Sequence, residues 1–160
     1  MEAVNIHQYD EQVVFRLVNL YMETGRADQA IEVLDEAIKY HPENYRFHWS
    51  KGLIFFRNND YDQAITCFKK ALEEEEGEAM IHYHLGVIYY NQGIELQEAS
   101  LKIRNKEAYR EMRELALEKF RESVTWLEKA SVLDPGDEKT KSLLNQLYYQ
   151  LDTGRKNSGQ

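Results

Sequence analysis

The chain has a single cysteine and no long apolar run. With Cys67 alone in 160 residues, an internal disulfide is excluded. We expect Cys67 to be a small buried hydrophobe rather than a reactive thiol, because free cysteine is usually buried and inert. No apolar run approaches the roughly 20 residues that span a bilayer, and the N-terminus lacks the basic start and apolar core of an export signal. The sequence predicts a soluble chain without membrane insertion, cytoplasmic as it stands or periplasmic if an upstream export signal has been removed.

The sequence also has fewer basic than acidic residues, and it lacks the common catalytic motifs. Twenty-eight acidic residues against twenty basic ones give a net charge of −8, which opposes binding to nucleic acid and to anionic membrane surfaces. The sequence contains no nucleophile elbow, phosphate-binding glycine loop, paired-cysteine motif or HExxH motif. We therefore expect neither an enzyme nor a cofactor, and no nucleic-acid partner.

What the sequence does contain is an internal repeat of 34 residues. In the segment 49–71 the pattern is set by Gly52, Phe55, Ala64, Phe68 and Ala71. The same pattern appears 34 residues earlier at Val18, Tyr21, Ala30, Leu34 and Ala37, and it begins again 34 residues later at Gly86 and Tyr89. Small residues at these places let two antiparallel helices approach closely, and each pair needs the next to cover its remaining apolar surface.

The third copy differs from the first two. Helices are expected over 10–23 and 27–40, then 44–57 and 61–75, but the third copy returns to register only after 25 additional residues, between Tyr89 and Ser123. Apolar stripes continue through these residues, so they predict two lengthened helices that project as an arm with its tip at 104–106. Gly93 is the place where a kink could interrupt this arm, although the apolar stripe keeps its phase there.

The period resembles the tetratricopeptide repeat. The first copy carries the resemblance with Leu17, Tyr21, Gly25, Ala30, Leu34, Ala37 and Pro42. Lys51 and Glu76 depart from it, where Leu17 and Pro42 stand in the first copy. The likeness covers residues 11–151 and implies an all-α fold, a right-handed superhelix of three helix pairs with the third pair extended by the insertion. The segments 126–137 and 147–151 look like the C-terminal part of tetratricopeptide proteins of Bacteroidota.

The resemblance divides the chain into one repeat domain with short ends. The domain spans 10–152, with repeats at 10–42 and 44–76, an extended repeat at 78–135 and a capping helix at 138–151. Residues 1–9 are expected to be a lead-in, and 153–160 a flexible tail.

In the superhelix of this family, the first helix of each pair lines a concave groove. The resemblance implies three rows of lining residues: Phe15, Trp49 and Tyr83; Asn19, Leu53 and Val87; and Met22, Phe56 and Tyr90. Family members that hold a C-terminal carboxylate use Lys, Asn and Arg in these rows, and only Asn19 matches. The expected partner is therefore a peptide or amphipathic helix of another protein, held by apolar anchors.

Three alternatives remain open at this point. The groove aromatics could pack between adjacent helices instead of facing a partner, since large exposed aromatic patches are uncommon. The chain could form homo-oligomers or dock to another subunit, through the groove or through the arm, whose surface residues would be Leu96, Leu101, Ile103, Tyr109 and Met112. A metal site at His82 and His84 is disfavoured, because residues two apart on a helix point to different faces.

Overall fold

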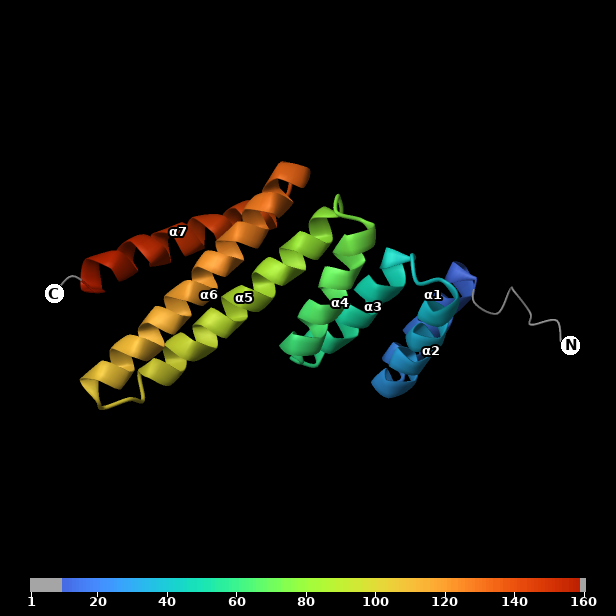
Figure 1. The fold of residues 1–160 in the computed structure, drawn as a ribbon, viewed down its shortest axis with the longest axis horizontal. Helices are drawn as coiled ribbons and strands as arrows, with labels where there is room; N and C mark the ends of the chain where they lie inside the picture. The colour runs from blue at the N-terminus through green and yellow to red at the C-terminus, as the bar shows by residue number, and fades with distance from the viewer. Residues whose placement is uncertain (1–9, 159–160) are drawn as a thin grey trace, which may run out of the picture. The chain divides into compact units, whose positions relative to one another are not determined.

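The computed structural model describes residues 10–158, with side chains described through Asp152. The lead-in expected over 1–9 and the last two positions of the tail lie outside the described residues. Within the described part the chain forms helices and no strands, which confirms the all-α prediction (Figure 1). The helices are α1 (Glu11–Glu23), α2 (Ala27–Tyr40), α3 (Tyr45–Arg57), α4 (Tyr61–Glu74), α5 (Ala79–Ser100), α6 (Lys106–Leu133) and α7 (Glu138–Ser158).

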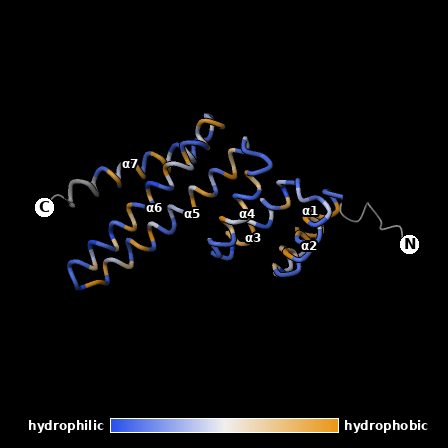
Figure 2. Tube along the Cα trace, viewed as in Figure 1, coloured by the Kyte–Doolittle hydropathy of each residue, from blue (hydrophilic) through white to orange (hydrophobic). Residues whose placement is uncertain are grey.

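Local sequence signals account for where the helices begin and end. Asp10, Asn44 and Asn105 each accept hydrogen bonds from backbone N–H groups of the first helical turn, which would otherwise lack partners. Gly25 ends the α1 segment with φ +71°, a conformation that glycine adopts without strain. Between the ends, hydrophobic residues recur at intervals along each helix (Figure 2), as expected for helices with one buried face.

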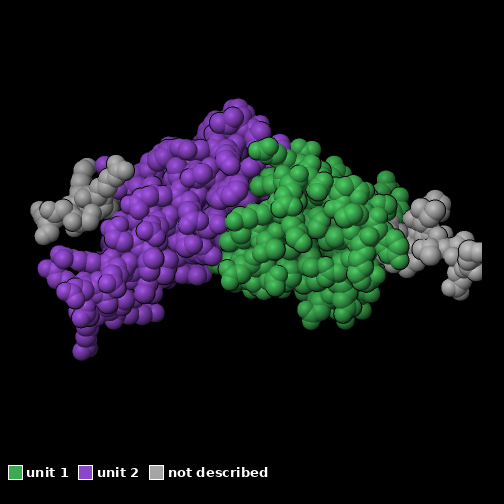
Figure 3. Space-filling view, viewed as in Figure 1, with its two compact units in different colours: residues 1–76 green, residues 77–160 purple. Residues whose placement is uncertain are grey.

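The chain divides into two compact units (Figure 3). Unit 1 ends at Glu76 and contains α1 to α4, and unit 2 begins at Gly77 and contains α5 to α7. Each repeat of a helical array contacts only its neighbours, so a division between two helix pairs is compatible with a single repeat domain.

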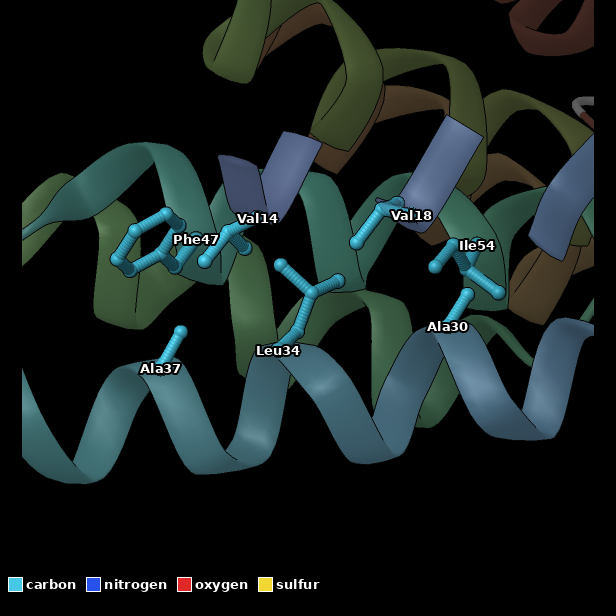
Figure 4. Packing of buried hydrophobic residues seen from close by; sticks show 7 residues of the cluster. All are labelled: Val14, Val18, Ala30, Leu34, Ala37, Phe47 and Ile54. Carbon is cyan, nitrogen blue, oxygen red and sulfur yellow. The ribbon is translucent and has the colours of Figure 1, made fainter. Parts of the chain in front are cut away.

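The core of unit 1 is shared by α1, α2 and α3. Leu34 lies at its centre, fully buried, with Ala30 and Ala37 one turn away on either side (Figure 4). Val14 and Val18 of α1 and Phe47 and Ile54 of α3 complete the cluster. In the second pair, a Cβ added to Gly52 would lie 2.6 Å from the Phe68 ring, so α3 and α4 approach as closely as the small residue predicted.

In unit 2, α5 and α6 pack against each other as a long antiparallel hairpin (Figure 1). They have 22 and 28 residues, against 13 or 14 in α1 to α4. A Cβ on Gly86 would lie 2.5 Å from Leu127, and one on Gly93 would lie 2.4 Å from the Phe120 ring. Gly93 is buried within an uninterrupted α5, so it is a point of close helix packing and not of helix termination.

Helix α7 packs on α6 and supplies Leu144 and Leu147 to the core of unit 2. It extends to Ser158, beyond Leu151, where the capping helix was expected to end. The flexible tail expected over 153–160 stays a prediction. The glycine and polar residues there were read as helix-breaking. A single interior glycine such as Gly154 costs a helix only about 1 kcal/mol, however, and no proline follows it.

Candidate functional site

The expected groove residues of unit 1 lie on α1 and α3. Phe15, Asn19 and Met22 share one face of α1, because they are spaced by four and three residues, and Trp49, Leu53 and Phe56 have the same spacing on α3. We call these six residues the α1–α3 face. Asn19 is exposed and the other five are half-buried.

The aromatic members of this face divide their surface between the core and solvent. The Phe15 ring meets the buried Phe47 ring edge-on, with centroids 5.5 Å apart, and Phe56 lies 6.3 Å from Tyr61. Met22 packs against the same core cluster as Phe15. These side chains therefore contribute to packing and still present apolar surface to solvent.

The Trp49 side chain is partly enclosed by the protein and does not lie freely on the surface. The indole is half-buried, and its Nε1 is enclosed without a hydrogen-bond acceptor among the described residues. A buried N–H without an acceptor is uncommon and costs free energy. Replacement of Trp49 would therefore disturb packing as well as any binding, which makes the exposed Asn19 the better position for testing this face.

Glu11 joins the first turns of α1 and α3. Its carboxylate accepts hydrogen bonds from Asn44 Nδ2 at 2.9 Å and from the Arg46 guanidinium at 2.8 Å. The Asn44 hydrogen bond, assisted by Arg46, holds the pKa of Glu11 below its usual value. Sequence reasoning missed this contact, because Glu11 belongs to the first repeat and its two partners to the second, and neither pair is separated by 34 residues.

In unit 2, the expected groove residues lie on α5 and pack more heavily than the period suggested. Tyr83 and Tyr90 lie against the core cluster that α6 and α7 complete, and burial raises the pKa of Tyr83. The Tyr90 ring is 6.0 Å from Phe120, and its hydroxyl accepts a hydrogen bond from Gln146 Nε2 at 2.8 Å. Val87, which lies between Tyr83 and Tyr90 in the sequence, is also half-buried.

The histidines of α5 are packing residues. His82 is 3% exposed and its ring lies 5.6 Å from Trp126, while the His84 ring lies 5.7 Å from Tyr83. Among the described residues, no group of three His, Cys, Asp or Glu side chains is placed to hold a metal ion.

Burial lowers the pKa of His84 to about 4, from an ordinary 6.5. Between these pH values the His84 side chain binds a proton in the unfolded chain but not in the folded one. The contribution of His84 to the free energy of unfolding is therefore fully present above pH 6.5, and it declines as the pH falls towards 4. We expect the free energy of unfolding to fall by about 2 kcal/mol from pH 7 to pH 5 through this group. Urea denaturation at both pH values would measure the change, and His84→Gln should lack most of it; an equal decline in that variant would contradict the assignment.

Two residues noted in the sequence have simple structural roles. Cys67 is buried on α4, and burial raises the pKa of its thiol, which disfavours the reactive thiolate. Lys51, which departs from the repeat pattern, is half-buried and forms an ion pair with Asp35 of α2 at 2.5 Å. Its ammonium group is therefore satisfied within unit 1.

The arm residues differ in how much surface they offer. Leu101, at the end of α5, is 72% exposed, and Leu115 on α6, which sequence reasoning did not select, is 48% exposed. The other predicted arm residues are half-buried: Leu96, Ile103, Tyr109 and Met112.

None of the helices in the described part of the chain combines the length and apolar character needed to cross a membrane.

Comparison with known proteins places this architecture in a known group. The family model described as the tetratricopeptide repeat matches residues 15–74 and 54–99. Human superkiller complex protein 3 is 33% identical over 82 residues, an alignment that covers 51% of this chain and 5% of that protein. This chain thus spans a small fraction of the relative's length.

Solved structures agree with the fold over nearly the whole chain. A monomeric mutant of IFIT1 with Gppp-AAAA has a TM-score of 0.72 at 20% identity, covering 98% of this chain and 33% of that one. The first repeat domain of Spaghetti (RPAP3), bound to the HSP90 peptide SRMEEVD, has a TM-score of 0.62 at 18% identity, covering 89% and 96%. At these identities the likeness shows a shared helical solenoid fold.

Proposed function

Because the chain belongs to the tetratricopeptide repeat family, whose domains are protein–protein interaction modules, we propose that it is a non-enzymatic binding module for a segment of another protein. The observation that carries this proposal is the α1–α3 face, where five large apolar side chains are half-buried and Asn19 is exposed. A protein domain of similar fold, the first repeat domain of Spaghetti (RPAP3), binds a peptide, which supports the same class of ligand here.

The chemistry of the face selects the kind of segment it would bind. Phe15, Trp49 and Phe56 offer apolar ring surface, and neither Lys nor Arg is among its six members. An extended peptide or an amphipathic helix with aliphatic or aromatic anchors would bury this surface, at about 25 cal/mol for each Å² of apolar area. The net charge of −8 disfavours nucleic acid as the ligand.

The repeat boundaries belong to the same proposal. We infer a repeat domain over 10–152, with repeats at 10–42 and 44–76, an extended repeat at 78–135 and a capping helix that begins at 138. The division of the chain between Glu76 and Gly77 supports the boundary between the second and third repeats.

A substitution at Asn19 tests the proposed face with little risk to the fold. Peptides selected by display against the wild-type chain should be rich in apolar anchors. Asn19→Arg should weaken their binding at least tenfold, because a bulky cation would stand among the apolar side chains. Gln29→Arg, at a position on α2 that is also exposed, is the matched control and should bind like wild type. Equal affinity for both variants, or failure to select any peptide, would contradict the proposal.

The arm supports a second candidate function, self-association or docking to another subunit. Leu101 and Leu115 are exposed leucines on α5–α6 and would be covered in such an assembly. This interaction would lie in unit 2, so Asn19→Arg should leave it intact. The α1–α3 face is favoured because three of its members are aromatic, Phe15, Trp49 and Phe56, whereas Tyr109 is the one aromatic side chain among the arm residues.

A further inference from the structure

The connection between α5 and α6 carries a concentration of positive charge. Residues 101–110, which form this connection and the start of α6, contain four basic residues and one acidic residue. They contribute +3 to the net charge of −8, which leaves −11 for the rest of the chain. In Figure 1 the connection lies at one end of the hairpin, drawn in yellow. We call five of its residues the arm tip: Leu101, Lys102, Arg104, Lys106 and Arg110.

The cations of the arm tip have no internal partner. All four basic side chains are exposed: Lys102, Arg104, Lys106 and Arg110. Among the described residues, none of the four has a carboxylate within 4.0 Å. Lys106 and Arg110 are one turn apart on α6, a spacing at which like charges repel each other. The arm tip therefore holds unneutralised positive charge in an otherwise acidic chain.

Hydrogen bonds hold the backbone of this connection in place. The Ile103 N–H donates to the carbonyl oxygen of Ser100 at 3.0 Å. Asn105 Oδ1 accepts hydrogen bonds from the backbone N–H groups of Glu107 and Ala108, each at 3.0 Å. The four charges are therefore attached to a fixed backbone, which reduces the entropy that is lost when a partner binds.

An aliphatic side chain accompanies these charges. Leu101 is 72% exposed and directly precedes Lys102 in the chain. A partner that neutralised the cations would also cover Leu101, and burying this apolar surface would contribute to binding. The arm tip is therefore suited to a ligand that carries an apolar group together with its anionic groups.

Nearby carboxylates limit the size of the anion that the arm tip can hold. Glu98 of α5 and Glu107, Glu111 and Glu114 of α6 are all exposed. They would repel a long polyanion or an anionic bilayer that extended past the arm tip, and the −11 charge of the rest of the chain would add to this repulsion. A short acidic segment of a protein is favoured over nucleic acid and over a membrane surface.

We propose that the arm tip binds a short segment of a partner protein in which carboxylates flank an aliphatic side chain. The carboxylates would accept charge-assisted hydrogen bonds from the lysine and arginine side chains, and the aliphatic group would lie on Leu101. This inference rests on the second candidate function above, docking through the arm, and gives the chemistry of the partner. It involves no residue of the α1–α3 face, so either site can fail without the other.

The probe is the peptide N-acetyl-Glu-Glu-Leu-Glu-Glu-amide, added to the ¹⁵N-labelled full chain. The backbone amides of residues 101–110 should shift saturably. The affinity should fall about tenfold when NaCl is raised from about 50 to about 300 mM, because salt screens exposed charges. A peptide with Gln in place of each Glu should give no saturable shift. A peptide with Ala in place of Leu should bind about threefold more weakly, because it buries less apolar surface.

Charge reversal at the arm tip identifies the residues responsible. Lys102→Glu combined with Arg104→Glu should lower the affinity for the probe at least tenfold. Lys69→Glu combined with Lys70→Glu changes the net charge by the same amount at two exposed positions on α4, and should bind like wild type. Asn19→Arg, which tests the α1–α3 face, should also bind the probe like wild type. Equal losses in the two charge-reversed proteins, or no saturable shift at 101–110, would overturn the proposal.

Other occupants of the arm tip would give different results. Oligouridylate represents RNA, and vesicles of equimolar phosphatidylcholine and phosphatidylserine represent an anionic membrane. Tighter binding of either one than of the probe, lost on charge reversal of Lys102 and Arg104, would overturn the choice of a protein segment. Light scattering over a range of concentrations tests for a second copy of this chain. Self-association that the same charge reversal abolishes would overturn this inference and leave the arm as a docking surface.

Discussion

Replacing Gly93 with leucine is expected to lower the free energy of unfolding of unit 2 by more than about 3 kcal/mol, the upper end of what overpacking normally costs. A Cβ alone at this position would lie 2.4 Å from Phe120 Cε1, and a leucine adds three more carbons in the same direction. Helix α5 would have to move away from α6, or Phe120 would have to leave the core. Gly93→Ala should cost less, because the gain of about 1 kcal/mol in helix propensity offsets part of the clash.

The measurement is urea denaturation combined with amide hydrogen exchange resolved along α5 and α6. Glu98→Leu, at an exposed position on the same helix, controls for the introduction of a leucine and should change stability by less than about 0.5 kcal/mol. Comparable stability of the Gly93→Leu and Glu98→Leu proteins would show that α5 and α6 do not approach closely at Gly93.

Removal of the Phe47 side chain is expected to be similarly costly in unit 1. Phe47 is fully buried, touches the Phe15 ring edge-on and belongs to the cluster built around Leu34. Phe47→Ala should lower the free energy of unfolding by about 3–5 kcal/mol, because it removes apolar contacts and leaves a cavity. Loss of exchange protection should begin in α1 to α3.

Leu20→Ala is the control for Phe47→Ala, since Leu20 is 51% exposed on α1. It should change stability by no more than about 0.5 kcal/mol. If the two variants are equally stable, Phe47 does not hold the core of unit 1, and the packing of the α1–α3 face would need another explanation.

The helices themselves were largely predictable from the sequence. The small residues of the 34-residue period have local and unambiguous consequences, so the expected helix 27–40 coincides with α2, and the expected 61–75 differs from α4 by one residue. Gly93 was ambiguous, because a glycine within a helical pattern can mark either a kink or a close approach. The choice depends on Phe120, which a distant part of the chain supplies.

Features that combine residues from different repeats could not be read from the period. Nothing in the sequence spacing brings Glu11 to Asn44 and Arg46, because they meet only where the first turns of α1 and α3 lie together. The division of Tyr83 and Tyr90 between packing and exposed surface depends on α7. The likeness to Bacteroidota proteins and the cellular compartment stay predictions.

The most direct test of the proposed function is a chemical-shift map of the chain with its tightest display-selected peptide. The peptide is expected to shift backbone amides of α1 and α3 around Asn19 and Leu53, with saturation at a single affinity. The exposed surfaces of α2 and α4 should remain unchanged. Shifts confined to α2, α4 or unit 2 would contradict the assignment of the α1–α3 face as the binding surface.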